Sequence, residues 1–215
     1  MEKERKKGLN TKYLSTILGG LYLFLTGISF FWYDPHFLLW IQKKTELPFA
    51  NDFANFLSSY GRLEWSTLFV SVCFVLLALF SNKRKKYFTL AKVCFLGGLL
   101  AGISVWPSKT ILGRERPRGT GNDTLHFFKF SPQDDAVYYS LPSGHAASSM
   151  GSAIPVFLLS PITGTPLIIM AILTGWSRIK QNEHWPSDVL AGWFLGLLCG
   201  YWIYKRTKKQ NYSGS

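Results

Sequence analysis

The stretch FTLAKVCFLGGLLAGISVW, residues 88–106, comes close to the about 20 apolar residues that a helix needs to cross a bilayer. Five further runs of the 215-residue chain have the same character. The sequence therefore predicts an all-α fold, a polytopic membrane helix bundle with six transmembrane helices, in a single integral-membrane domain over residues 1–215. The fifth run is short, and it spans only if it borrows residues 161–165 and 177–179. The six runs are Leu14–Tyr33, Glu64–Phe80, Phe88–Trp106, Gly144–Ser160, Pro166–Trp176 and Pro186–Tyr204.

The N-terminal part of the chain is expected to contain an uncleaved first span and an interfacial segment. Leu14–Tyr33 follows a basic start, as a signal peptide would, but its apolar core is too long and no small-residue cleavage site follows it. Residues 34–63 mix aromatic and aliphatic side chains with charges, which favours one or two amphipathic helices at the membrane surface. A plain surface loop is the alternative, because the apolar spacing is imperfect.

The spacing of small residues predicts close helix packing. Gly192, Gly196 and Gly200 recur every four residues in the last run, so one face of that helix lets a neighbouring backbone approach. We expect the fourth run to pack in the same way. Its small residues are Ala146, Ala147, Ser148, Gly151, Ser152 and Ala153.

The positive charge of the chain gathers on one side of the expected bundle. The net charge is +12, and all of it falls on residues 1–13, on the connection between the second and third runs together with Lys92, and on residues 205–215. Because lysine and arginine collect in cytoplasmic loops, residues 1–13 and 205–215 are predicted to be cytoplasmic tails and residues 34–63 to be extracytoplasmic. The basic residues form no stripe with interleaved aromatics, so no nucleic acid is expected as a partner.

Three polar clusters interrupt the apolar chain. The expected topology brings all three to the extracytoplasmic face, so residues 109–188 form the candidate active-site region. Any one cluster alone is typical of an ordinary polar loop, but three at one face indicate a site. The clusters are Lys109 with Arg116-Pro117, then Pro142-Ser143-Gly144-His145, then Ser177-Arg178 with His184 and Asp188.

The cations in these clusters suit a phosphate group. Lys109, Arg116 and Arg178 offset the charge of a phosphate monoester, and the two arginines can each grip two oxygens at once. Arg114 and Arg118 flank the first cluster, either as substrate contacts or as ordinary solvated charges.

The second cluster is predicted to begin a helix that contributes backbone amides. Ser143 is a natural N-cap, and Gly144 lets the backbone come close to a ligand. The free amides of that helix start would then bind phosphate oxygens. The aromatic-rich loop over residues 118–141 is expected to cover the site or to contact the substrate.

Two histidines lie beside the cations and are the candidate catalytic groups. Asp188 follows His184 by four residues, so the carboxylate can hold one ring nitrogen and leave the other as a free lone pair. This holds even if the helix begins only at Pro186 and His184 lies just before it. His184 is therefore the expected nucleophile, and His145 the general acid for the leaving oxygen.

A zinc site is the alternative use of these three side chains. His145, His184 and Asp188 are suitable zinc ligands. Three cations converging on the same place would repel a metal dication, however. We therefore expect no metal ion, and no other cofactor.

Together these clusters resemble the three-part signature of the type 2 phosphatidic acid phosphatase family. The resemblance implies a metal-independent, two-step phosphatase that acts through a phosphohistidine on His184, polarised by Asp188. It also implies that His145 protonates the leaving group and later helps to activate water. The same signature occurs in soluble vanadium-dependent haloperoxidases, which the apolar runs disfavour. The residues that would hold the phosphate are Lys109, Arg116, Ser143, Gly144 and Arg178.

The resulting hypothesis is a multi-pass protein of the cytoplasmic (inner) membrane whose active site lies on the periplasmic face and whose partners are the bilayer and a lipid phosphate. Undecaprenyl pyrophosphate, phosphatidylglycerol phosphate, phosphatidic acid and lipid A 1-phosphate all remain as candidate substrates. A lipid phosphotransferase that uses the same site is one alternative. A non-enzymatic lipid-phosphate carrier or sensor is another, although it would have no use for both a nucleophile and an acid. The oligomeric state stays open.

Overall fold

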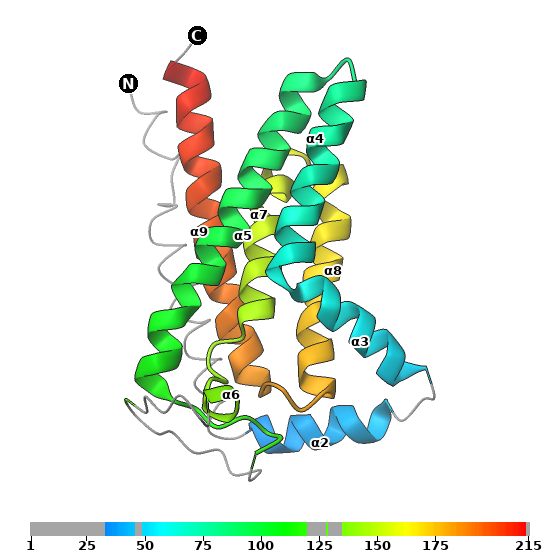
Figure 1. Cartoon of the computed structure of the whole chain (residues 1–215), viewed down its shortest axis with the longest axis vertical. Helices are drawn as coiled ribbons and strands as arrows, with labels where there is room; N and C mark the ends of the chain where they lie inside the picture. Colours follow the sequence, from blue (N-terminus) through cyan, green and yellow to red (C-terminus); the bar gives the residue numbers. More distant parts are fainter. Residues whose placement is uncertain (1–32, 46–48, 120–127, 129–134, 214–215) are drawn as a thin grey trace, which may run out of the picture.

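The computed structural model describes residues 33–45, 49–119, 128 and 135–213, and every element in this part of the chain is a helix (Figure 1). The all-α prediction is therefore confirmed. The first predicted span, Leu14–Tyr33, lies outside the described residues except for its last one. The elements are α2 (Asp34–Lys44), α3 (Ala50–Gly61), η2 (Glu64–Phe69), α4 (Val70–Phe80), α5 (Arg84–Leu112), α6 (Asp135–Tyr138), α7 (Gly144–Leu159), α8 (Pro161–Lys180) and α9 (Pro186–Ser213).

Each of the other five apolar runs forms a helix near its predicted position. By length and composition, α5 and α8 are each able to cross a membrane. The pair formed by α3 with η2 and α4 counts as a third candidate if it is one span, although it bends by 67° at its break. α8 includes the flanking residues that the short fifth run needs. A bundle of six spans remains a prediction.

The 34–63 segment forms two helices, which agrees with its predicted helical character. Pro35 lies in the first turn of α2, where a missing N–H costs nothing. α2 packs against α8 and α9, and α3 packs mainly against α8. Both helices therefore border the end of the bundle that carries the polar clusters (Figure 1).

α7 is the central helix, and it packs against α5, α8 and α9. Its small residues bring neighbouring backbones unusually close. A Cβ atom added at Gly97 of α5 would lie 2.2 Å from the carbonyl oxygen of Gly151, and one added at Gly196 of α9 would lie 2.5 Å from that of Ala147. The predicted close packing of the fourth and last runs is confirmed, and it holds the N-terminal turn of α7 in a fixed position.

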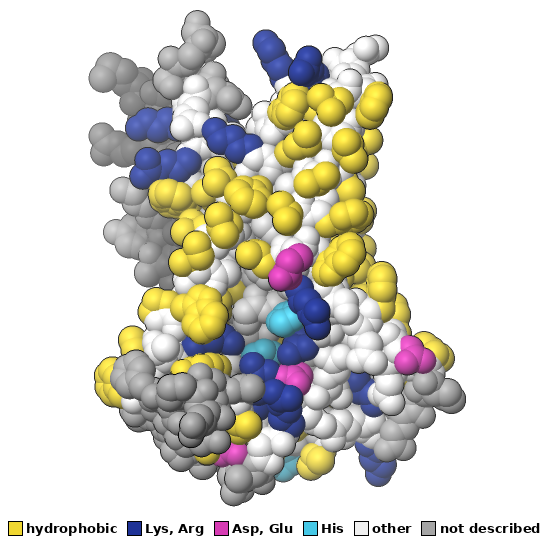
Figure 2. All heavy atoms as spheres, viewed as in Figure 1, with side chains coloured by type: hydrophobic (Ala, Val, Ile, Leu, Met, Phe, Trp, Pro, Cys, Tyr) yellow, Lys and Arg dark blue, Asp and Glu magenta, His cyan; other side chains and the backbone are white. Residues whose placement is uncertain are grey.

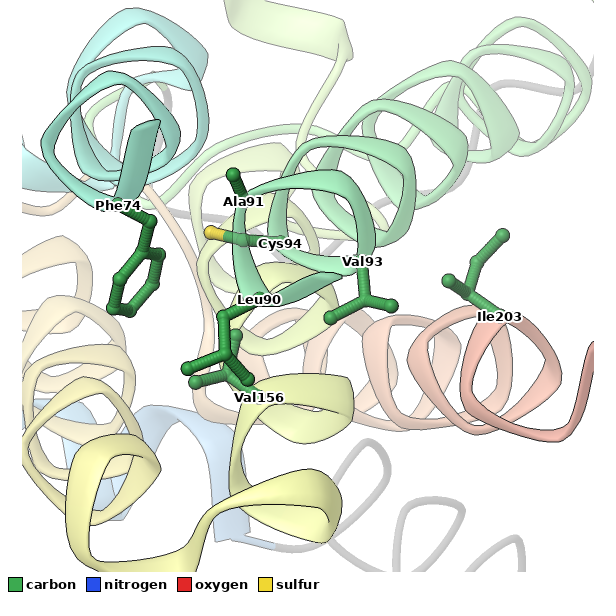
Figure 3. Close-up of a cluster of buried hydrophobic side chains, with 7 residues drawn as sticks. All are labelled: Phe74, Leu90, Ala91, Val93, Cys94, Val156 and Ile203. Carbon is green, nitrogen blue, oxygen red and sulfur yellow. The ribbon is translucent and has the colours of Figure 1, made fainter. Parts of the chain in front are cut away.

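A buried apolar cluster joins four helices on the other side of the bundle from the polar loops. Phe74 of α4, Leu90 and Val93 of α5, Val156 of α7 and Ile203 of α9 all belong to it (Figure 3). Many large apolar side chains nevertheless remain exposed, among them Phe80 and Ile162. Exposed apolar surface of this extent is typical of a helix bundle that faces lipid.

The charges lie at the two ends of the bundle. The turn between α4 and α5 and the C-terminal part of α9 lie at one end, whereas the loops that follow α5 and α8 lie at the other (Figure 1). In Figure 2 a band of hydrophobic side chains separates the basic groups of the first end from a hollow with Lys, Arg, His and acidic side chains at the second. This separation agrees with the predicted grouping of the charges, and which end is cytoplasmic remains a prediction.

Candidate active site

The three predicted clusters meet at one end of the bundle. Lys109 lies in the last turn of α5, Arg116 in the loop that follows it, and His145 in the first turn of α7. These three residues line one cavity of about 620 Å³, together with Gly144 and Tyr139. Apolar residues just before η2 and in α5 also line the cavity, which therefore suits an amphipathic molecule. Those residues are Leu63, Gly102, Ile103, Val105 and Trp106.

The third cluster is positioned by the end of α8. The amides of Glu183 and His184 both donate to the carbonyl oxygen of Arg178, at 3.1 and 3.3 Å. Asn182 adopts a φ of 57°, a left-handed conformation that asparagine tolerates, and so turns the chain back on the helix. This turn brings His184 close to Arg178. α9 then begins at Pro186, so His184 lies just before that helix.

Glu183 connects the cations of the first and third clusters. Its carboxylate accepts hydrogen bonds from Arg116, and it pairs with Arg178 at 3.3 Å and with Arg118 at 3.1 Å. Lys109 Nζ donates to the carbonyl oxygen of Tyr139 at 2.7 Å. Glu183 was not among the predicted site residues, although its position next to His184 in the sequence was a signal that could have identified it.

Two buried arginine nitrogens have no partner within the described part of the chain. Arg116 Nε and Arg178 Nε are both inaccessible to solvent and without a hydrogen-bond acceptor there. A buried donor without a partner costs about 1–3 kcal/mol. Because both guanidiniums also pair with Glu183, their unpaired N–H groups lie in the same part of the site. A phosphate group is the kind of ligand that would satisfy both donors.

His184 and Asp188 approach each other as predicted. His184 Nδ1 lies 3.7 Å from Asp188 Oδ2 and 3.4 Å from the hydroxyl oxygen of Ser140, which itself donates to that carboxylate oxygen at 2.5 Å. The Nδ1 edge of the ring therefore faces the carboxylate, and Nε2 is the nitrogen turned away from it. His184 is buried and does not line the cavity.

The imidazole of His184 is held in its neutral form. Burial lowers its pKa well below the usual 6.5, the neighbouring carboxylate of Asp188 opposes this shift, and the nearby charges of Arg116, Arg178 and Lys109 add to it. A neutral imidazole has the lone pair that a nucleophile needs.

The helix start in the second cluster has the predicted geometry. The side chain of Ser143 accepts a hydrogen bond from the amide of Ala146 at 3.5 Å, which makes it the N-cap of α7. The amide of Ser143 donates to the carbonyl oxygen of Asp188 at 2.9 Å. This bond ties the start of α7 directly to the start of α9, and hence the second cluster to the third.

Arg114 has neither of the two roles considered for it from the sequence. Its side chain is fully buried, and its guanidinium lies between two carboxylates. It donates to Asp188 Oδ1 and Ser187 Oγ, both at 2.6 Å, and to Asp34 Oδ2 at 2.7 Å. The pairing of Arg114 with Asp34 could not be predicted from the sequence, because Asp34 lies in a segment predicted to be interfacial. Arg118 is 42 % exposed and pairs with Glu183, which agrees with a largely solvated charge.

Comparisons with known proteins identify the family. Residues 86–212 match the model of the PAP2 superfamily. An undecaprenyl-diphosphatase of Sulfolobus acidocaldarius is 37 % identical over 150 residues, which cover 68 % of this chain and 65 % of that protein. A lipid A 1-phosphatase of Porphyromonas gingivalis is 36 % identical over 134 residues, 54 % of this chain and 26 % of that protein. The chain thus spans less than two thirds of the length of these relatives.

The fold also resembles that of a solved membrane phosphatase. The crystal structure of the transmembrane PAP2-type phosphatidylglycerolphosphate phosphatase from Bacillus subtilis superposes with a TM-score of 0.60 at 20 % identity, over 90 % of this chain and 96 % of that one. The chain therefore belongs to the PAP2 superfamily, as its signature predicted, and is an integral membrane protein.

Proposed function

We propose that this protein is a metal-independent lipid phosphatase that removes a terminal phosphate from a membrane lipid, either a monoester or a diphosphate. The observation that carries the proposal is the pair of buried, unpartnered N–H groups of Arg116 and Arg178 beside the neutral imidazole of His184. The names of the relatives support the substrate class, since they are an undecaprenyl-diphosphatase and a lipid A 1-phosphatase.

In the first step, Nε2 of His184 attacks the phosphorus atom of the bound phosphate. A P–N bond forms while the P–O bond to the lipid breaks, and its electron pair stays on the lipid oxygen. His145 donates a proton to that oxygen. Lys109, Arg116 and Arg178 offset the charge on the phosphoryl oxygens, and Asp188 stabilises the positive charge that develops on the His184 ring.

In the second step, water attacks the phosphohistidine from the side that the lipid has left. The P–N bond breaks, its electron pair returns to Nε2 of His184, and His145 takes the proton of the water. The sum of the two steps is hydrolysis of a phosphate ester, with both histidines restored. This exchange of acid and base roles requires His145 to face the leaving group and the water in turn.

The test is covalent trapping on the purified protein in detergent. A lipid carrying a radiolabelled terminal phosphate is mixed with enzyme and quenched in base, in which phosphohistidine survives. The wild-type chain should retain label and release phosphate, and His184→Ala should do neither. His36→Ala is the matched control, because His36 is an exposed residue of α2, and this variant should behave as wild type.

His145→Ala separates the two catalytic roles. It should be labelled slowly by a lipid phosphate, but at nearly the wild-type rate by 4-nitrophenyl phosphate, whose leaving group needs no proton. Phosphate release by His184→Ala at the wild-type rate would refute the mechanism. Binding of lipid phosphate without release by the wild-type chain would support a carrier instead.

A further inference from the structure

Arg62 contributes a cation to the active-site cavity from outside the three clusters. It lies at the break between α3 and η2, and its side chain lines the cavity with Lys109, Arg116 and His145. The residue is exposed, and no hydrogen bond or ion pair to its guanidinium occurs among the residues described. Glu64 lines the same cavity without pairing with it. A lone arginine in a catalytic cavity is available to an anionic part of the ligand.

The backbone around Arg62 is fixed against the general acid. A Cβ atom added at the preceding Gly61 would lie 3.1 Å from Cβ and Cδ2 of His145 and 2.3 Å from Cγ2 of Thr174. The carbonyl oxygen of Gly61 accepts a hydrogen bond from Ser148 of α7 at 3.2 Å. Arg62 is therefore attached to a turn that touches His145, rather than to a loop that is free to move away.

Arg62 lies on the His145 side of the site. Both side chains line the cavity, and a Cβ atom at the neighbouring Gly61 would lie 3.1 Å from Cδ2 of His145, whereas His184 does not line this cavity. If His184 attacks the phosphorus and His145 protonates the departing oxygen, a cation beside His145 faces the departing group. A departing alcohol has no charge for it to hold, but a departing phosphate does.

We infer that Arg62 is a specificity-determining residue that binds the inner phosphate of a lipid diphosphate, so that the preferred substrate class is a diphosphate rather than a phosphate monoester. This inference rests on the proposed phosphatase function. When the outer phosphorus bonds to His184, the bond to the bridging oxygen breaks. The electron pair stays on the departing lipid monophosphate, which takes the proton of His145 while Arg62 offsets its charge.

The test compares two substrates with the same chain, farnesyl diphosphate and farnesyl phosphate, by release of the first phosphate. Arg62→Gln should lower kcat/KM for the diphosphate roughly 10- to 100-fold, as expected for a lost charge-assisted hydrogen bond, and change it for the monophosphate by less than about twofold. Arg62→Lys should recover part of the loss, because it keeps the charge. Lys44→Gln, which removes an exposed cation of α2 outside the cavity, should leave both substrates unaffected.

Equal losses for the two substrates would overturn the assignment and indicate a general interfacial cation, and no loss for either would overturn it as well. If the wild-type chain hydrolyses neither substrate, the proposed function fails separately. In that case the role of Arg62 is tested by calorimetry, which measures the affinity of the wild-type and Arg62→Gln chains for methylene diphosphonate, a diphosphate analogue that is not hydrolysed. A loss of its affinity in Arg62→Gln with unchanged affinity for inorganic phosphate supports the subsite, and unchanged affinity for both overturns it.

Discussion

Removing Arg114 should destabilise the protein and reduce its activity, although this residue does not line the cavity. Its guanidinium joins three elements, because it pairs with Asp34 of α2 at 2.7 Å and with Asp188 of α9 at 2.6 Å from the loop after α5. All three side chains are fully buried. Removing one partner of a buried ion pair costs about 3–5 kcal/mol, since a buried charge is left without compensation.

Arg114→Met should therefore lower the free energy of unfolding by about 3–5 kcal/mol. The carboxylate most affected should be that of Asp34, because burial raises its pKa even while Arg114 is present, although it still accepts hydrogen bonds from the amide and the hydroxyl of Ser187. Burial raises the pKa of Asp34, and the charge of Arg114 lowers it. Without Arg114 the pKa of Asp34 should rise further, so adding Asp34→Asn to Arg114→Met should recover about 1–3 kcal/mol.

The assay is unfolding in mixed detergent micelles, followed by circular dichroism, for a double-mutant cycle of Asp34→Asn and Arg114→Met. The matched control is Arg118→Met, which breaks a partly exposed pair and should cost less than about 1 kcal/mol. The turnover number should also fall in Arg114→Met, because Asp188 orients His184, while KM changes little. An effect of Arg114→Met no larger than that of Arg118→Met, or additive effects in the cycle, would refute this reasoning.

Two further predictions concern the nucleophile and the packing of α7. Because the pKa of His184 is lowered, its neutral form persists below pH 6.5 and is lost only as the pH falls further. The acid limb of kcat/KM, corrected for substrate ionisation measured by phosphorus NMR, should have its midpoint below that value, and a midpoint above it would contradict the neutral-imidazole assignment. Gly196→Ala should lower the free energy of unfolding by about 1–3 kcal/mol, because the added Cβ would lie 2.5 Å from the carbonyl oxygen of Ala147. In Gly102→Ala the added Cβ would have its nearest neighbour 3.5 Å away, so the free energy of unfolding, measured in the same micelles, should not change. Equal losses in the two variants would argue against the close contact between Gly196 and Ala147.

The helices and the three clusters were readable from the sequence because they are local patterns. An apolar run of span length, a serine before a glycine, and a proline in a first turn each act within a few residues of the chain. For this reason α5, the N-cap Ser143 and the start of α9 at Pro186 occur as predicted. The spacing of Gly192, Gly196 and Gly200 also predicted a contact face, since it depends only on the helical period.

The ion-pair partners of the groups in and around the site could not be predicted from the sequence in the same way. Arg114 was weighed as a substrate contact or a solvated charge, and it is instead buried between two carboxylates. Glu183 pairs with three arginines from two segments, the loop after α5 and the last turn of α8. Such pairings depend on which segments pack together, and nothing in the residues near Arg114 indicates that α2 lies beside it.

The sequence by itself determined the membrane character of this protein, its helices and the chemical groups of its site, because hydropathy, helix caps and the signature residues are properties of short stretches of chain. Only the tertiary structure decided which nitrogen of His184 faces Asp188, which carboxylates hold Arg114 and which extra cation reaches the cavity. The physical reason is that buried charges are stable only with partners, and those partners come from segments that meet when the helices pack.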